Sequence, residues 1–179
     1  MSENVKQLYL GKLGIEYGQF YFDSPDDEDD YPELEEAFTD QKNGICGAAT
    51  PGKVFFITGI QNGTISVLIE LFSICPPVDD EYDEVVEVAF FNNGSAPIHL
   101  CQWGHEWTRK LDLPKGHYRI RYSIQGMDKD YDEDDNWDAP IPGQRHMIQL
   151  WPQDQQEDEV VKLTSEMAKY WHEEQGCVY

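Results

Sequence analysis

The chain has 179 residues, a formal net charge of −22 at pH 7 and a pI near 4.3, while 40% of its residues are hydrophobic and 13% are aromatic. This content excludes a disordered acidic tail, so the charge must lie on a folded body. A field of this sign repels DNA, RNA and anionic membranes and attracts basic proteins. We therefore expect a cationic protein as the partner, and neither nucleic acid nor membrane.

Alternating and apolar runs near the start of the chain predict strands and one short helix. Residues 14–22 alternate in hydropathy and predict a first strand. A proline, several acids and a closing glycine delimit a short helix within residues 31–44. Two further strands are expected over residues 44–50 and 53–60, on either side of a Pro-Gly turn.

The middle of the chain predicts longer strands. An Asn-Gly pair at residues 62–63 predicts a hairpin, because this pair favours a tight turn between apolar runs. The hairpin leads into residues 64–74, which are apolar on both faces and predict a central strand. Residues 84–91 predict the next strand, which ends at an Asn-Asn-Gly turn.

Four more strands are expected before residue 152. Short strands are expected within residues 97–103 and 108–113, and a Pro-Lys-Gly turn then leads into a strand over residues 117–125. Its alternation predicts one buried face and one solvent-exposed face, the latter carrying His117, Arg119, Arg121 and Ser123. Residues 145–151 predict the last strand, closed by Pro152.

These elements predict a mainly β fold. Strands at about ten-residue spacing, joined by hairpin turns without interleaved helices, indicate an antiparallel β-sandwich. We expect one domain over residues 1–179, with its core in residues 13–152 and an amphipathic C-terminal helix at about 157–175. The apolar stripe of that helix consists of Val160, Leu163, Met167 and Tyr170 or Trp171. Trp151, at the end of a strand, and Trp171 are expected to lie in the core.

Cysteine usage and hydropathy favour the cytoplasm. The four cysteines, at positions 46, 75, 101 and 177, form no C-x-x-C pair, which favours reduced thiols. The first residues lack the continuous apolar run of a signal peptide. No stretch is apolar over the roughly 18 residues that a membrane helix requires. The sequence carries no signal for an oligomeric state.

Sequence motifs give no support for catalysis or a cofactor. G-x-S-x-G, H-E-x-x-H and phosphate-binding glycine loops are missing from the sequence, so we expect a non-enzymatic protein, with a dispersed-site enzyme as an alternative. His99, Cys101 and His105 form part of a zinc pattern. Since no fourth ligand has matching spacing, we expect a partly buried thiol and a rim histidine there, and no metal or other cofactor.

The segment MDKDYDEDDNWDA, residues 127–139, is the strongest candidate for a binding site. No register of it supplies the glycine and the final glutamate of an EF-hand. A looser calcium site remains an alternative, in which Asp128, Asp130 and Asp132 converge. Trp137 lies among the acids as aromatic anchors do in interaction hot spots, although it would also serve as a lid over the sheet.

Other acids form separate blocks along the chain, at residues 23–36, 79–87 and 154–159. Each block alone reads as a solvated loop. Since each adjoins a connection between predicted strands, a sandwich would gather several at one end. Uncompensated charge destabilises the compact state, and a basic partner would relieve it.

Several segments, in order and spacing, resemble the ComJ family of competence-type inhibitors of a DNA-entry nuclease. They are IEYGQFYF, GICGAATPGKVFFITG, VVEVAFF, PIHLCQW, RKLDLPKGHYRIRY and HMIQLWP, within residues 13–152. The strongest local piece is the turn at residues 111–116 with Tyr118. The resemblance implies a β-sandwich that binds and silences a nuclease, and it carries over no inhibitory residue.

The sequence thus predicts an acidic inhibitor or immunity protein that neutralises a basic nuclease or toxin. Its carboxylates would occupy a phosphate-binding cleft, and electrostatic attraction would speed capture. A calcium- or ligand-binding module is the first alternative. The expected contact residues are Asp128, Asp130, Asp132, Glu133, Asp134, Asp135, Trp137 and Asp138.

Overall fold

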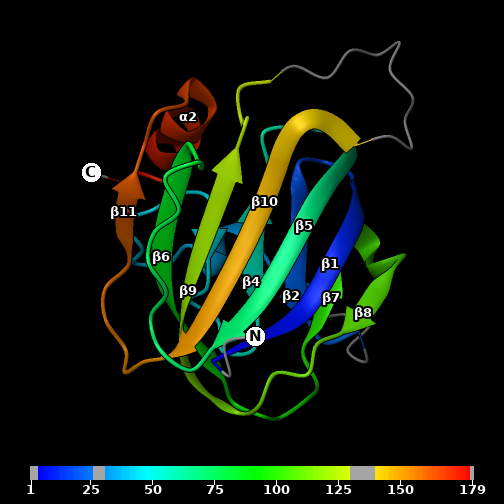
Figure 1. Ribbon diagram of the computed structural model, residues 1–179, viewed down its shortest axis with the longest axis vertical. Helices are drawn as coiled ribbons and strands as arrows, with labels where there is room; N and C mark the ends of the chain where they lie inside the picture. Colours follow the sequence, from blue (N-terminus) through cyan, green and yellow to red (C-terminus); the bar gives the residue numbers. More distant parts are fainter. Residues whose placement is uncertain (1–3, 26–30, 130–139, 178–179) are drawn as a thin grey trace.

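Two β-sheets make up most of the protein, which confirms the mainly β prediction (Figure 1). The computed structural model describes residues 4–25, 31–129 and 140–177. Across the first sheet the strand order is β1 (Val5–Ile15), β5 (Gly63–Phe72), β10 (Pro140–Pro152), β9 (Gly116–Gln125), β6 (Glu84–Asn92) and β11 (Glu159–Lys162). Across the second it is β3 (Cys46–Gly47), β4 (Val54–Ile57), β2 (Gln19–Asp23), β7 (His99–Cys101) and β8 (Thr108–Lys110).

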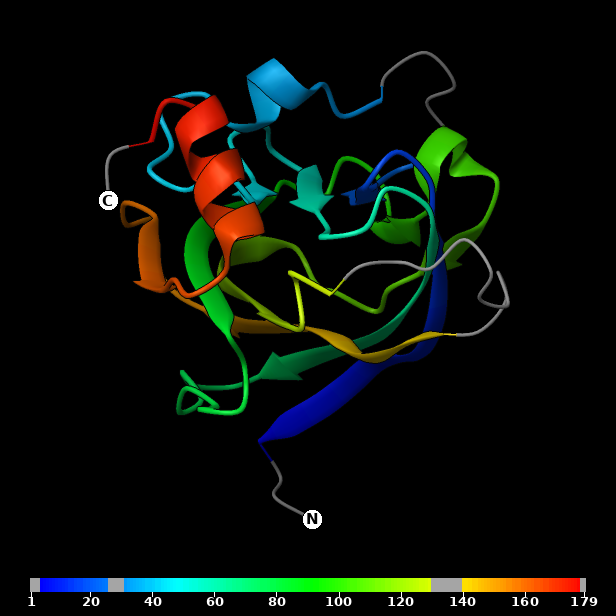
Figure 2. The ribbon, with the colours of Figure 1, turned by 90° about the horizontal axis from the view of Figure 1, so that it is seen from above.

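The two sheets face each other (Figure 2), and an aromatic core lies between them. Phe20 and Phe56 of the five-stranded sheet stack at a centroid distance of 4.7 Å, and both meet Tyr122 of β9 edge-on. All three side chains are fully buried. Burying each such ring stabilises the fold by about 1.5–3 kcal/mol, so this layer holds the two sheets together.

In the described part of the chain, the strand pairs are antiparallel with one exception. β10 runs parallel to β5, with Met147 opposite Leu68, and antiparallel to β9. This one pair departs from the antiparallel pairing that the sequence predicts, while the mainly β fold is confirmed. Tyr17 (φ 56°) and Gly18 (φ 72°) lie in the turn between β1 and β2, where the chain crosses from one sheet to the other. Residues 14–22 thus form parts of two strands.

The predicted hairpin at Asn62-Gly63 is also corrected. β4 precedes this pair and β5 begins at Gly63, but the two strands belong to different sheets and do not hydrogen-bond to each other. The chain crosses from one layer of the sandwich to the other at this point. The prediction of an interior strand there is confirmed, since β5 lies between β1 and β10.

The helices are shorter than predicted. α1 spans Leu34–Ala37 inside the expected helix of residues 31–44, and a 3₁₀ turn, η1, spans Trp103–His105. α2 spans Glu166–Glu174, and part of the stretch predicted as its first turns is β11. Two adjacent β-branched residues, Val160 and Val161, favour this strand. Among the described residues, no helix has the length and apolar character needed to cross a membrane.

α2 closes one corner of the sandwich beside β6 and β11 (Figure 1). The backbone N–H of Gly44 donates to Nδ1 of His172 at 2.8 Å, which ties the helix to the segment before β3. A Cβ on Gly44 would overlap the carbonyl oxygen of Trp171, so only glycine permits this approach. Trp171 is partly buried against the core, as its predicted place on the apolar stripe requires.

Candidate protein-binding surface

The structure gives one residue of the predicted binding loop a structural role. Asp128 accepts hydrogen bonds from the backbone N–H groups of Glu166 (3.0 Å) and Met167 (2.9 Å), the first two residues of α2. These groups have no partner within the helix itself, so Asp128 acts as a remote cap. The other predicted contact residues, Asp130, Asp132, Glu133, Asp134, Asp135, Trp137 and Asp138, lie outside the described residues.

Acids of the other predicted blocks also satisfy backbone groups. Glu84 is fully buried and accepts from the N–H groups of Thr164 (2.9 Å) and Ser165; burial raises its pKa, against the effect of these hydrogen bonds. Asp158 accepts from the N–H groups of Lys42 and Asn43, both at 2.7 Å. These carboxylates hold connections in place and are not available as contact groups.

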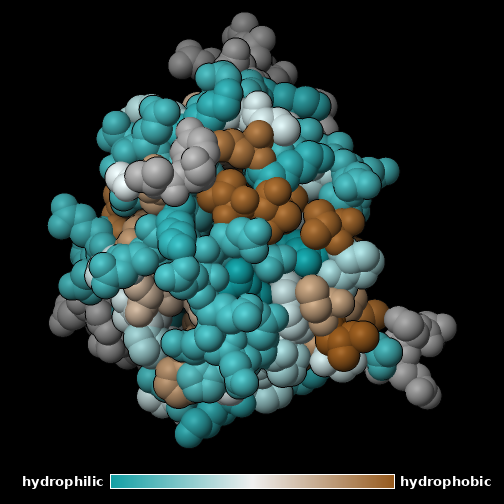
Figure 3. Space-filling model, turned by 90° about the vertical axis from the view of Figure 1, so that its left-hand side faces the viewer, coloured by the Kyte–Doolittle hydropathy of each residue, from teal (hydrophilic) through white to brown (hydrophobic). Residues whose placement is uncertain are grey.

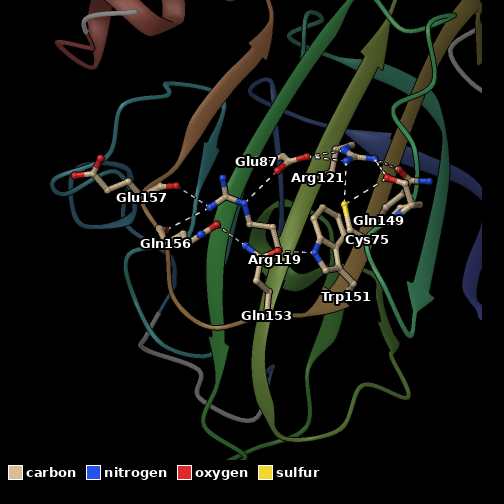
Figure 4. Close-up of polar contacts among 10 residues, drawn as sticks. Cys75, Glu87, Arg119, Arg121, Gln149, Trp151, Gln153, Gln156 and Glu157 are labelled. Carbon is tan, nitrogen blue, oxygen red and sulfur yellow. Dashed lines mark hydrogen bonds and ion pairs between the residues drawn. The ribbon is translucent and has the colours of Figure 1, made fainter.

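The prediction that one face of β9 is exposed to solvent is also corrected. Arg119, Arg121 and Ser123 are buried, each with at most 3% of its surface accessible. Both guanidinium groups bind Glu87, Arg119 at 3.3 Å and Arg121 at 2.8 Å (Figure 4). One carboxylate therefore serves two buried cations.

Two connections cover this face of the six-stranded sheet and satisfy the remaining guanidinium donors. Arg119 donates to the carbonyl oxygens of Gln156 (3.3 Å) and Glu157 (2.8 Å). Arg121 donates to those of Pro76 (2.9 Å) and Pro77 (3.1 Å). Arg121 also lies 5.0 Å from the ring centroid of Trp151, which is buried here and not between the sheets (Figure 4). The cluster fixes two loops and offers no accessible charge.

The outer face of the five-stranded sheet carries a different feature, an open pocket of about 480 Å³ with aromatic walls. This volume falls within the roughly 300–1,000 Å³ of small-ligand pockets. Tyr21 and Phe55 form a buried floor, with ring centroids 5.2 Å apart. We call this cavity the aromatic pocket; its lining residues are Gln19, Tyr21, Tyr31, Pro32, Glu33, Leu34, Phe55, Trp103 and Gly104.

Four segments of the chain build the aromatic pocket. β2 and β4 supply the floor, the segment leading into α1 supplies Tyr31 and Glu33, and η1 supplies Trp103. Trp103 is 37% exposed and lies 4.7 Å from the ring of Tyr17. Gly104 (φ 65°) reverses the chain after it, in a left-handed conformation that suits glycine. The sequence analysis assigned no role to Trp103, although two tryptophans in a short turn segment are an available signal.

A buried carboxylate lies beside the pocket. Asp23, at the end of β2, is 1% exposed and contacts Nε2 of His105 at 2.9 Å and Nζ of Lys53 at 3.8 Å. Burial raises the pKa of Asp23, while its hydrogen bonds and these cationic groups oppose the increase. Burial, and then the nearby charges of Asp23 and Glu33, also raise the pKa of the Tyr21 phenol. Asp23 and Glu33 therefore both disfavour a negative charge on Tyr21.

The partial zinc pattern is not assembled in the described part of the chain. His105 binds Asp23, and Nδ1 of His99 contacts the carbonyl oxygen of Pro97 at 3.1 Å. The thiol of Cys101 is buried against backbone carbonyl groups. Among residues 4–25, 31–129 and 140–177, no three His, Cys, Asp or Glu side chains lie together as metal ligands would.

Exposed acids outnumber exposed bases on the described surface. Of the described residues, sixteen Asp or Glu are exposed, against eight Lys or Arg. Several exposed bases are engaged in pairs, including Lys42 with Glu157 and Arg145 with Glu81. The side of the molecule that carries β11 and α2 is mostly hydrophilic, with a short hydrophobic band (Figure 3). The surface thus keeps the sign that the composition predicts.

One group of exposed acids adjoins the aromatic pocket. Glu33, Glu35, Glu36 and Asp40 lie on and beside α1, and we call them the α1 acids. None of them forms an ion pair with another described residue. Glu33 also lines the pocket. Aromatic rings next to unpaired carboxylates form a surface that suits a cationic protein.

Comparison with known proteins finds similarity in structure. No family model matches the chain, and no curated protein sequence matches it. Its fold is similar to that of Bacillus subtilis ComJ, named as an inhibitor of the DNA degrading activity of NucA, with 18% identity and a TM-score of 0.54 over 83% of this chain and 98% of ComJ. The protein named crocagin biosynthetic gene J is also similar, with 18% identity and a TM-score of 0.50 over 86% of this chain and 100% of that one. The predicted resemblance to ComJ is thereby confirmed for the fold.

Proposed function

We propose that this chain is a non-enzymatic inhibitor or immunity protein that binds and neutralises a basic protein, a nuclease. The observation that carries the proposal is the group of α1 acids beside the aromatic pocket, on a chain with a net charge of −22. Charge of one sign that is not paired within the described structure destabilises the folded chain by self-repulsion. A basic partner offsets that repulsion on binding.

The fold similarity supports the inhibitory role. ComJ is named as an inhibitor of a DNA-degrading activity, and the match extends over nearly all of it. A nuclease presents a cationic cleft that binds phosphate groups, and carboxylates on a rigid β-scaffold are suited to occupy such a cleft. Long-range attraction then raises the rate of association. Inhibition follows from occupying the cleft and requires no catalysis by this chain.

Two acidic segments are proposed as the contact surface. The first is the α1 acids with the aromatic pocket. The second is the loop with Asp130, Asp132, Glu133, Asp134, Asp135 and Asp138, and with Trp137 as its anchor. Asp128 is excluded from this set because it caps α2. We also propose a cytoplasmic location, where the four free thiols would stay reduced.

The test is inhibition of a purified basic DNase, with a nuclease encoded beside this gene as the first choice and NucA as the second. Cleavage of a fluorescently labelled DNA duplex should stop at about one equivalent of the chain, while the chain alone neither binds nor cleaves the duplex. Association should slow steeply as salt shortens the Debye length from about 10 Å at 0.1 M to about 3 Å at 1 M. Undiminished cleavage by both enzymes, or association that does not depend on salt, would refute the proposal.

A further inference from the structure

The aromatic pocket is shaped to take one side chain of a partner. Its floor of Tyr21 and Phe55 is buried, whereas Trp103 and Tyr31 at its sides are 37% and 40% exposed. Large apolar rings around this cavity are partly exposed to water, so a ligand that covers them lowers the free energy of the complex. In protein interfaces such cavities receive anchor side chains of the partner.

The charges around the pocket select a cationic occupant. Glu33 supplies a carboxylate to the lining, and among the described lining residues there is no lysine or arginine. Asp23 lies buried behind the floor, and both acids disfavour additional negative charge at Tyr21. The partner group is therefore a cation with apolar character, since an anion would be repelled by these carboxylates, and a purely apolar group would not interact with the exposed carboxylate of Glu33.

Arginine matches this lining better than lysine does. A guanidinium is planar and weakly hydrated, stacks on aromatic rings and donates in a fork to a carboxylate. An ammonium is strongly hydrated and makes only a point contact. We propose that the aromatic pocket is an arginine-binding site, in which Trp103 and Tyr31 contact the guanidinium of a partner arginine and Glu33 accepts its hydrogen bonds. The proposal rests on the proposed function, because it names the anchor of the basic partner.

The probe is N-acetyl-arginine amide, titrated into the isotopically labelled chain and followed by NMR. The indole N–H of Trp103 and the backbone signals of Tyr21, Tyr31 and Glu33 should shift together with a millimolar dissociation constant. The lysine amide should bind at least about fivefold more weakly. The citrulline amide, which has nearly the same shape without the charge, should bind at least about tenfold more weakly.

Two tryptophans of nearly equal exposure provide a matched pair of variants. Trp103→Ala should weaken arginine amide binding about tenfold, and Glu33→Gln about fivefold. Trp107→Ala should change it less than twofold, because Trp107 is 36% exposed but packs 5.9 Å from Tyr9, outside the pocket lining. Unchanged spectra of the remaining signals would show that each variant is folded.

The proposal is overturned if the arginine amide shifts none of the pocket signals, if citrulline or leucine amide binds as tightly as arginine, or if Trp107→Ala weakens binding as much as Trp103→Ala. The probe separates this inference from the proposed function. A chain that inhibits a nuclease but does not bind the arginine amide would contradict the arginine site alone. A chain that binds the amide through Trp103 but inhibits no nuclease would support the site and contradict the function.

Discussion

Replacing Asp128 with alanine tests the structural role of an acid that the sequence places in the binding loop. Three N–H groups at the start of α2 have side-chain acceptors: Asp128 accepts from Glu166 and Met167, and Oγ of Ser165 accepts from Ala168 at 3.2 Å. The Asp128→Ala change removes the acceptor of two of them. It also removes a negative charge from the positive end of the helix dipole.

The expected loss of stability follows from these contacts. Removing a capping acceptor costs about 0.5–2 kcal/mol, and removing the favourable charge about 0.3–1 kcal/mol. Since α2 has nine residues and is too short to be stable alone, the loss should appear in global unfolding. Together these terms predict a decrease of about 0.8–3 kcal/mol for Asp128→Ala. Asp128→Asn keeps an oxygen acceptor and should lose only about 0.3–1 kcal/mol.

Urea unfolding followed by tryptophan fluorescence measures this difference. The midpoint should fall at constant m-value for Asp128→Ala and fall less for Asp128→Asn. Asp80→Ala serves as the control, because its exposed carboxylate has no hydrogen bond to a described residue. Affinity for the partner should be the same for all three variants. An unchanged midpoint combined with weaker partner binding would refute the capping role and return Asp128 to the contact surface.

Three further variants test the interior. Glu87→Gln removes the one carboxylate between two buried guanidinium groups and should destabilise the fold by about 3–5 kcal/mol, measured as a urea midpoint; a loss below about 1 kcal/mol would contradict the assigned pairing. Burial lowers the pKa of His146 to about 3, so the unfolded chain takes up a proton on this residue at a higher pH than the folded chain does, and stability should fall as the pH falls from 6.5 toward 3. The slope is at most about 1.4 kcal/mol per pH unit for this one group, and His146→Asn should show a smaller slope; equal slopes would be inconsistent with a buried neutral imidazole. Gly44→Ala should lower stability by about 1–3 kcal/mol because the added methyl group overlaps the backbone of α2 at Trp171, and an unchanged melting temperature would show that α2 does not pack there.

The sequence predicts those parts of the fold that depend on local patterns. β6 and β9 begin and end within a residue or so of their predicted bounds, because period-two alternation and turn residues delimit them. The connection at Asn62-Gly63 was predicted less well. The Asn-Gly pair indicates a turn, but whether the next strand joins the same sheet depends on the whole sandwich.

The largest error of the sequence analysis is the exposure of Arg119 and Arg121, and it arises because segments distant in the sequence cover these residues. Alternation assigned Arg119 and Arg121 to a wet face, since charged side chains are mostly exposed. In the structure, carbonyl groups from two distant connections accept their hydrogen bonds, and Glu87 of the neighbouring strand supplies the charge. No pattern within β9 reports these partners. The same limit applies to Asp128, whose hydrogen-bond partners lie 38 and 39 residues away.

The candidate site was only partly accessible from sequence. Composition predicts an acidic surface, and the described residues show it. The aromatic pocket joins residues near positions 20, 32, 55 and 103, which only the pairing of β2 with β4 and β7 brings together. The glycine-containing turn that presents Trp103 carries a weak signal in the local sequence. No local sequence pattern indicates that this turn lies beside the α1 acids.

The association rate constant with an inhibited nuclease, measured for matched charge variants, tests the central claim most directly. One variant neutralises Glu33, Glu35 and Glu36 as glutamines beside the aromatic pocket. The control neutralises Asp80, Asp154 and Glu159 as the matching amides, on connections and an edge strand of the other sheet, and so changes the net charge equally. A third neutralises Asp130, Asp132 and Asp134 as asparagines in the predicted loop.

We predict that the α1 variant associates at least about tenfold more slowly than the wild type at low salt, within the roughly 10–10³-fold range of electrostatic steering, whereas the control changes the rate less than about threefold. The difference should vanish at high salt. If the loop variant alone slows association, the contact surface is the loop, which is the second of the two proposed segments. Equal rates for all three variants and the wild type at low salt would contradict the claim that exposed carboxylates capture a basic partner.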